Sequence, residues 1–248
     1  MDADDVAHPE RLAAQRSRLA GDPGLAGCGT RVEYFPRDSL GSGARRYEGW
    51  LNAVQSPEEL RRELFVECPI AHPTLVIRAA ALHGLGGYRD VGWPEDYDLI
   101  LRAAVAGLEL ANLSLTGLAW RVSDERLSLR SAAYSPDAFR RCKAHFLVRH
   151  FLPAGRELAV WGAGKVGKPF ALALAAEGRA IDAFVDLDPR KIGQEIHGAP
   201  VIEPAALLER RPRPYALIAV GSPGARGEIR HELCGSDWQE LEDFRTVA

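Results

Sequence analysis

The stretch ELAVWGAGKVG, residues 157–167, decides the fold of the second half of the chain. The run ELAVW predicts a strand, and the glycines after it fit the pattern Gly-x-Gly-x-x-Gly. In this pattern Gly162 allows a tight turn, Gly164 lets a pyrophosphate approach the backbone, and Gly167 lets the next helix pack on the strand. The N-terminus of that helix supplies unpaired N–H groups and the positive end of a dipole.

An acidic residue follows the glycines at the spacing typical of dinucleotide-binding domains. Asp186 ends the next predicted strand, AFVDLD at residues 183–188, about twenty residues beyond the glycines, where a carboxylate can bind a ribose. Two interpretations stay open. Gly162, Gly164, Gly167 and Asp186 form a site for a nucleotide or dinucleotide, or the domain keeps its glycines for packing and binds nothing.

Strands and helices alternate from residue 156 to the end, which predicts a parallel sheet with helices on both faces. Upstream, the pattern predicts strands at 24–36, 72–78 and 117–123, and helices at 8–21, 56–65, 94–107 and 135–152. The fold class is therefore α/β. The domain boundary is expected at residues 153–156, between a first domain at 1–152 and a Rossmann-like domain at 156–248.

Composition narrows the functional classes. The chain has 248 residues, 46% of them hydrophobic, and a net charge of −3, so no bulk attraction to nucleic acid or anionic lipid is expected. The four cysteines form no Cys-x-x-Cys pair, which predicts reduced, mostly buried thiols. Apolar runs are too short for a bilayer-spanning helix, and the start is acidic, unlike a signal peptide. These features predict a cytoplasmic protein.

Residues 156–248 resemble the small N-terminal Rossmann-like domain of sugar O-acyltransferases of the sialic-acid and bacillosamine type. The matching blocks are GAGKVGK at 162–168, FVDLDPRKIGQEIHGAPVI at 184–202 and ALIAVGSPGARGEIRHEL at 216–233. In that family the domain contributes to nucleotide-sugar binding and precedes a left-handed β-helix. No hexapeptide repeat follows here, so the resemblance does not imply acyl transfer.

Residues 1–135 resemble the C-terminal half of a family 2 glycosyltransferase with the GT-A fold. The matching blocks are DADDVAHPERLAAQ at 2–15, HPTLVIRAAALHGLGGYRD at 72–90 and PEDYDLILRAAVAG at 94–107. The resemblance implies an inverting enzyme that moves a sugar from a nucleotide-sugar donor to a glycan or glycolipid acceptor. It implies that Asp2 and Asp4 hold Mg²⁺ or Mn²⁺ against the donor diphosphate, and that Asp96, with Glu95 beside it, is the catalytic base.

The residue types suit this chemistry. Carboxylate oxygens are ligands for hard divalent cations, and a carboxylate at a helix N-terminus is favoured in the ionised form that a base requires. Each assignment has a structural alternative. DADD can be a solvated terminus, Asp96 can simply charge the start of its helix, and Trp93 and Tyr97 can stack on a sugar or pack. His72 and His83 are expected to be structural.

Two features depart from the glycosyltransferase pattern. Ser123 stands where many members have a metal-binding His, and no nucleotide-binding half precedes DADD. We therefore expect a truncated glycosyltransferase, inactive alone unless another chain supplies the missing half. The alternative is a non-catalytic nucleotide-binding module acting through residues 156–248. An NAD-dependent oxidoreductase is disfavoured, since this segment leaves no room for a substrate domain and has no Tyr-x-x-x-Lys.

Overall fold

The structure, a computed structural model, describes residues 3–122, 131–222 and 224–248 and divides into two compact units. The first unit comprises Met1–Leu64 and Cys68–Ala138, and the second comprises Phe65–Glu67 and Phe139–Ala248. The sequence placed the boundary later, at 153–156. Helix α7, Pro136–Phe146, lies mostly in the second unit, because its Lys143 donates hydrogen bonds to the carbonyls of Val66 and Val247 at 2.7 and 3.1 Å.

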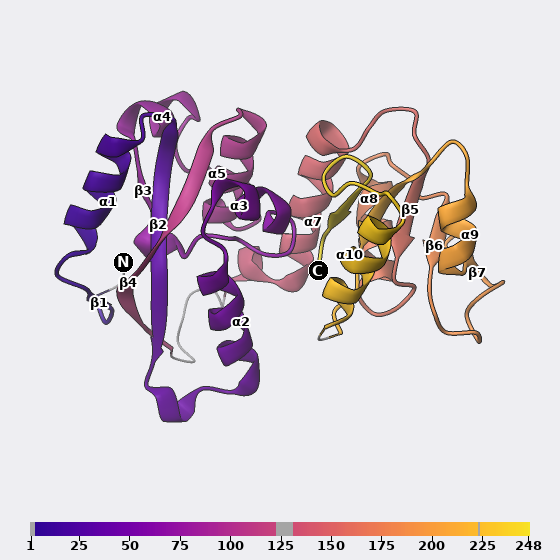
Figure 1. Cartoon of the computed structure of the whole chain (residues 1–248), viewed down its shortest axis with the longest axis horizontal. Helices are drawn as coiled ribbons and strands as arrows, with labels where there is room; N and C mark the ends of the chain where they lie inside the picture. Colours follow the sequence, from indigo (N-terminus) through magenta and orange to yellow (C-terminus); the bar gives the residue numbers. More distant parts are fainter. Residues whose placement is uncertain (1–2, 123–130, 223) are drawn as a thin grey trace. The chain divides into compact units, whose positions relative to one another are not determined.

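The first unit contains a mixed sheet with the strand order β1-β4-β2-β3 (Figure 1). Its strands are β1 (Val6–Ala7), β2 (Leu25–Phe35), β3 (Val76–Ile77) and β4 (Glu109–Arg121). The long strands β2 and β4 run parallel, and the two-residue strands β1 and β3 pair antiparallel at the edges. Very short edge strands offer little backbone for pairing with another chain.

Helices of the first unit surround this sheet. They are α1 (Arg11–Gly21), α2 (Ser42–Ala53), α3 (Pro57–Glu63), α4 (Ala79–Gly84) and α5 (Glu95–Val105). The capping box predicted for α3 is confirmed: Ser56 Oγ accepts from the Glu59 N–H at 3.2 Å, and the Glu59 carboxylate accepts from the Ser56 N–H at 2.8 Å. Helix α2 was not predicted, since two glycines interrupt its apolar pattern.

The second unit contains the predicted parallel sheet, in the order β10-β9-β5-β6-β8-β7. Its strands are β5 (Leu158–Trp161), β6 (Ala183–Val185), β7 (Glu195–Ile196), β8 (Ala199–Ile202), β9 (Tyr215–Ile218) and β10 (Phe244–Thr246). All pairings are parallel except that of β7 with β8. The α/β class and the parallel sheet are therefore confirmed.

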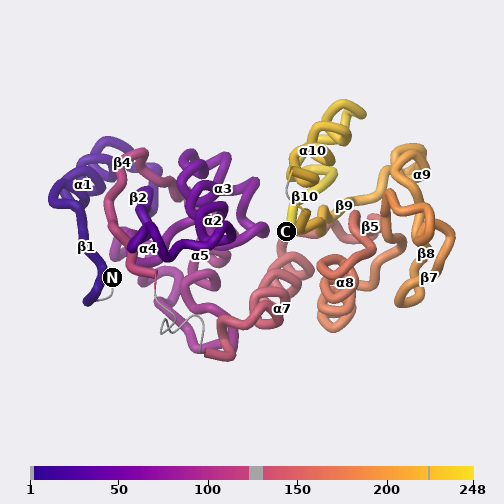
Figure 2. Tube along the Cα trace, turned by 90° about the horizontal axis from the view of Figure 1, so that it is seen from below, coloured from indigo at the N-terminus to yellow at the C-terminus, as the bar shows by residue number. Residues whose placement is uncertain are grey.

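Helices cover both faces of this sheet. In Figure 2, α8 (Gly167–Ala176) lies on one side of β5 and β9 together with α7, and α10 (Ala225–Gly235) lies on the other. Helix α9 is Pro204–Glu209. A buried hydrophobic core lies on the α10 side of the sheet. It combines alternate residues of the strands with residues of the helices and of the segment after α10: Ala159, Trp161, Val185, Ala216, Ile218, Leu207, Ile229, Leu233, Trp238 and Phe244.

The strand order creates a crevice. From β5 the chain proceeds to β6 and β8 on one side, and then crosses to β9 and β10 on the other side of β5. The loops that follow β5 and β9 therefore diverge. Ligands of open parallel sheets bind outside the carboxyl ends of the strands at such a switch point.

The burial predicted for the thiols is confirmed for Cys28, Cys68 and Cys142, whereas Cys234 is exposed. Within the described ranges, no helix combines the length and the apolar character that a bilayer crossing requires.

Candidate functional site

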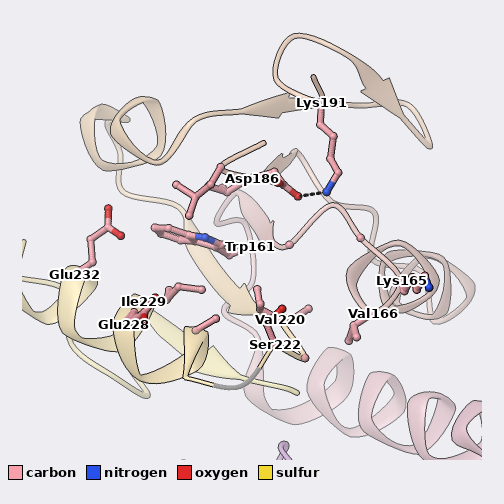
Figure 3. Close-up of a pocket in the computed structure, with 17 residues that line it drawn as sticks. Trp161, Lys165, Val166, Asp186, Lys191, Val220, Ser222, Glu228, Ile229 and Glu232 are labelled. Carbon is pink, nitrogen blue, oxygen red and sulfur yellow. Dashed lines mark hydrogen bonds and ion pairs between the residues drawn. The ribbon is translucent and has the colours of Figure 1, made fainter. Parts of the chain in front are cut away.

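A pocket of about 650 Å³ opens at the carboxyl ends of β5, β6 and β9, where the strand order predicts a crevice (Figure 3). Each strand contributes to its lining: Trp161 ends β5, Val185 ends β6, and Ala219 follows β9. Ile229 of α10 adds a further apolar surface. The glycine loop, also part of the lining, and the side chain of Asp186 add polar groups to this apolar floor.

Two glycines of the loop are required by the fold itself. Gly162 has φ of 120°, and a Cβ there would lie 2.6 Å from the carbonyl oxygen of Ala219. A Cβ on Gly167 would overlap the carbonyl oxygen of Gly162. The roles predicted from the sequence, a tight turn at Gly162 and close helix packing at Gly167, agree with these contacts.

Gly164 differs from both. It lines the pocket, yet a Cβ there would meet no described atom within 4 Å. Its lack of a side chain leaves the backbone open to the pocket without being needed for packing. Helix α8 begins close by at Gly167, and the first turn of this helix, all of it described, contains no acidic residue. An anion at this position would meet helix N–H groups and the positive end of the dipole.

Asp186 holds the loop in place. Its Oδ2 accepts hydrogen bonds from the Ala163 N–H at 3.0 Å and from Lys191 Nζ at 2.9 Å, and its Oδ1 accepts from the Asp188 N–H at 2.9 Å. Burial opposes ionisation, but the bonds from Lys191, Asp188 and Ala163 together hold the pKa of Asp186 below its usual value. A carboxylate has about four acceptor positions, so about one remains for a ligand. The ribose contact predicted for Asp186 stays a prediction.

Charged side chains stand on opposite sides of the pocket. Lys165 lies in the glycine loop and Lys191 pairs with Asp186, whereas Glu228 and Glu232 lie on α10 across the pocket (Figure 3). Sequence reasoning missed Lys191, Glu228 and Glu232. The two glutamates are four residues apart, a spacing that places side chains on one helix face, but nothing local indicates that this face borders the glycine loop.

Glu95 and Asp96 begin α5 in the first unit. Burial raises the pKa of Asp96, and the nearby His72, whose Nδ1 lies 3.9 Å from Asp96 Oδ2, opposes the rise. Both oxygens of Glu95 lie 2.9 Å from the hydroxyl of Tyr134, which donates to them. The structure thus places the side chains of His72, Glu95, Asp96 and Tyr134 close together. The catalytic roles predicted for Asp96 and Glu95 stay predictions.

The aromatic neighbours of this pair have structural contacts. Tyr97 is fully buried, and its hydroxyl donates to the Leu64 carbonyl at 2.6 Å, so it packs, as the structural alternative predicted. Trp93 Nε1 donates to Asp98 Oδ1 at 3.1 Å. His72 lies 3.0 Å from the Tyr88 hydroxyl, and His83 lies near the end of α4.

The acidic start of the chain has an internal partner. Asp4 pairs with Arg121 of β4 at 3.6 Å, and Asp5 accepts from the Arg121 N–H at 3.0 Å. Asp2 and Ser123 lie outside the described residues. In the part of the chain that the structure describes, no three His, Cys, Asp or Glu side chains are grouped to hold a metal ion. The Mg²⁺ or Mn²⁺ site predicted for Asp2 and Asp4 is therefore not supported.

Comparisons with known proteins correct the predicted family. No family model matches the chain. A solved structure described as the crystal structure of RSP, a Rex-family repressor, has 13% identity and a TM-score of 0.33 and covers 70% of this chain and 88% of that chain. At this TM-score the likeness carries no argument about the site.

The assignment to family 2 glycosyltransferases fused to a domain of the sugar O-acyltransferase type is wrong. No glycosyltransferase family model matches the chain, and the described carboxylates form no metal cluster. Asp4 is engaged by Arg121, so this described half of the predicted diphosphate clamp serves an internal ion pair. What stands is the α/β class with parallel strand pairing.

Proposed function

We propose that the chain is a nucleotide-binding module that acts through the pocket of the second unit. The ligand is a nucleoside diphosphate derivative or a dinucleotide, with its diphosphate over residues 162–167. The observation that carries the proposal is the contrast among the three glycines. Gly162 and Gly167 are needed for packing, but Gly164 is not, although it borders the pocket.

A purely structural role for the loop accounts for Gly162 and Gly167 alone. At Gly164, a bare backbone facing open space is what a diphosphate needs for close approach. The start of α8 and Lys165 add positive potential at the same place. The cavity of about 650 Å³ lies within the range of roughly 300–1,000 Å³ typical of small-molecule sites.

The test is calorimetric titration of the full chain with ADP-ribose, NAD⁺, NADP⁺ and UDP-glucose. A Gly164→Val variant should bind about tenfold more weakly or worse, because its side chain fills the path to the backbone. Its melting temperature should stay close to that of the parent, since space is open there. Gly49→Val is the matched control, because Gly49 of α2 also has open space and lies in the other unit.

Two results contradict the proposal. One is the absence of binding by the parent chain to every nucleotide of the panel. The other is unchanged affinity of Gly164→Val for a nucleotide that the parent binds.

A further inference from the structure

We infer that the pocket selects its ligand by the charge of the group that lies against α10. An uncharged, hydroxyl-rich group or a cationic group is accepted there, and a carboxylate or phosphate is rejected. This inference rests on the proposed function, because it concerns the second half of a ligand whose diphosphate lies over the glycine loop.

The fold assigns the two halves of such a ligand to different sides. In an open parallel sheet the ligand crosses the switch point at the carboxyl ends of the strands. The first nucleoside therefore lies on the side of β6 and Asp186, and the diphosphate lies over the loop after β5. The remaining group extends across β9 toward α10, whose residues Ile229, Glu228 and Glu232 line that side of the pocket.

The charges of the pocket divide in the same way. Lys165 and Lys191 stand on the side of the glycine loop and β6, and Glu228 and Glu232 stand on α10 (Figure 3). Both glutamates are exposed, and neither forms an ion pair with a described residue. The neighbouring Arg230 of the same helix pairs with Glu240 at 2.8 Å.

This arrangement favours some ligand groups and disfavours others. A hydroxyl can donate to a carboxylate, and such charge-assisted bonds are strong. A cation is attracted, whereas a second carboxylate is repelled by both glutamates. The apolar surface of Trp161, Val185 and Ile229 lowers the local dielectric, so the repulsion exceeds that in water.

The test uses two pairs of nucleotides that differ by one carboxylate. UDP-glucose is compared with UDP-glucuronate, and NAD⁺ with nicotinic acid adenine dinucleotide. For each pair whose neutral-ended member binds, the carboxylate member should bind about five- to tenfold more weakly at low salt. The penalty should shrink as the ionic strength rises, because exposed charges are screened.

Variants assign the penalty to α10. In Glu228→Gln/Glu232→Gln the two members of a pair should bind within about twofold of each other, since both repelling charges are gone. Glu209→Gln, at the exposed end of α9 and outside the pocket lining, should keep the full penalty. Equal melting temperatures show that these exposed substitutions leave the fold intact.

Equal affinity of the parent chain for both members of a pair overturns the inference and leaves nucleotide binding standing. So does a penalty that survives in the double variant. If no nucleotide binds at all, the proposed function fails and the inference fails with it.

Discussion

Asp186 shows how much one residue does for this pocket. A single carboxylate receives hydrogen bonds from the backbone of the glycine loop, from the turn at Asp188 and from the Lys191 ammonium. Its side chain is 14% exposed, so each of these donors loses its partner if the carboxylate is removed. The carboxylate therefore shapes the loop that we propose to hold the diphosphate.

Replacing Asp186 by Asn removes the charge and turns one acceptor into a donor. We expect a loss of about 1–3 kcal/mol of unfolding free energy, because the single amide oxygen can occupy only one of the two carboxylate positions. Either the Asp188 N–H, or both the Ala163 N–H and the Lys191 ammonium, then lose their acceptor. Urea unfolding of the parent and the variant measures this loss. Asp188→Asn is the control, since the Arg190 partner of Asp188 is exposed, and it should lose less. Equal losses would contradict the role of Asp186.

The glycines supply a second prediction at this scale. Gly167→Ala should lower the unfolding free energy by about 1–3 kcal/mol, because its Cβ overlaps a carbonyl and forces α8 away from β5. Gly164→Ala should change it little. Chemical unfolding of both variants measures the contrast, and similar values for the two would remove the basis of the proposed function.

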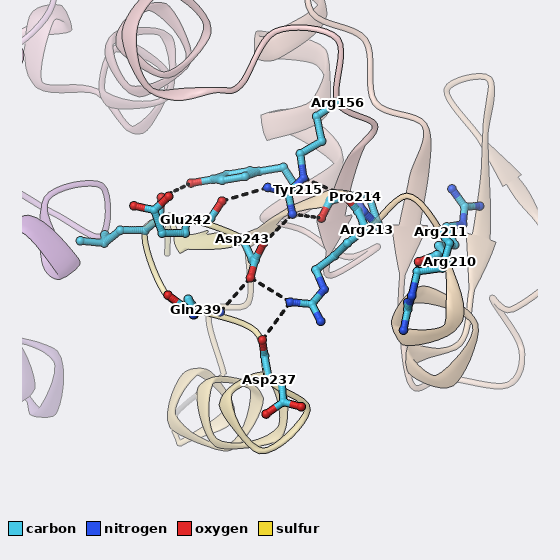
Figure 4. A network of polar contacts seen from close by, with 11 residues as sticks. Arg156, Arg210, Arg211, Arg213, Pro214, Tyr215, Asp237, Gln239, Glu242 and Asp243 are labelled. Atoms are coloured by element: carbon cyan, nitrogen blue, oxygen red, sulfur yellow. Dashed lines mark hydrogen bonds and ion pairs between the residues drawn. The ribbon is translucent and has the colours of Figure 1, made fainter.

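A network of hydrogen bonds and ion pairs joins the amino ends of strands in the second unit (Figure 4). The pocket lies at the carboxyl ends of the same sheet. Arg156, before β5, donates to the carbonyls of Arg213, Pro214 and Glu242 at 2.8–3.1 Å and to Asp243 at 2.6 Å. Parallel strands are joined by long crossovers rather than tight turns, so such contacts help to hold neighbouring strands in register.

Arg156→Ala should destabilise the second unit by about 2–4 kcal/mol, because one change removes the Arg156 donor from three carbonyls and from Asp243 Oδ1, although Arg213 and the Gln239 N–H still donate to Asp243 Oδ2. Arg210→Ala is the control. It breaks an ion pair with the half-exposed Glu157 at 3.0 Å and should cost less than about 1 kcal/mol. Thermal unfolding of the parent and both variants measures the two losses of stability. Equal effects would mean that the network is no more than a surface ion pair.

Across the whole molecule, folding shifts the pKa values of carboxyl groups in both directions. In the second unit, burial opposes ionisation of Asp186 and Asp243, but hydrogen bonds from Lys191, Arg156 and neighbouring N–H groups lower both pKa values. In the first unit, burial raises the pKa of Asp96. Folding thus favours the ionised form of two carboxyls in one unit and the neutral form of one in the other.

The pH dependence follows from these directions. The stability from Asp186 and Asp243 is present above the ordinary carboxyl pKa of about 4 and is lost as pH falls through their lower folded values. Acidification below about pH 4 should therefore weaken the second unit through these groups. Hydrogen exchange measured from pH 7 downward checks this, and protection of β5 and β9 that does not decline would contradict it.

Asp96 behaves in the reverse sense. Its raised pKa gives stability that is present below the ordinary carboxyl value and is lost as pH rises through the folded value. Asp96→Asn should consequently stabilise the first unit at pH 7–8, with a gain that vanishes below about pH 4. Melting curves of parent and variant across this range give the gain. A loss of stability at pH 8 would show that the carboxylate is favourably bound.

The sequence by itself determined the elements whose causes are local. The strand, glycine loop and helix at 157–176, the capping box of α3 and the alternation that produces a parallel sheet depend on neighbouring residues, and all were predicted. Helix α2 and the β7–β8 pair were not, because glycines weaken their local patterns. The glycosyltransferase resemblance was wrong because matching blocks along a chain do not establish a family or bring side chains together.

Only the tertiary structure decided which residues line the pocket and how they contact one another. Gly162 is required because Ala219, just after β9, approaches its backbone. Asp186, just after β6, is engaged by the N–H of Ala163 in the glycine loop after β5. Glu228 and Glu232 line the same pocket as the glycine loop because the strand order places β9 beside β5, and α10 follows β9. Each contact joins residues far apart along the chain or on different elements, and its distance is set by packing of the sheet rather than by local preference.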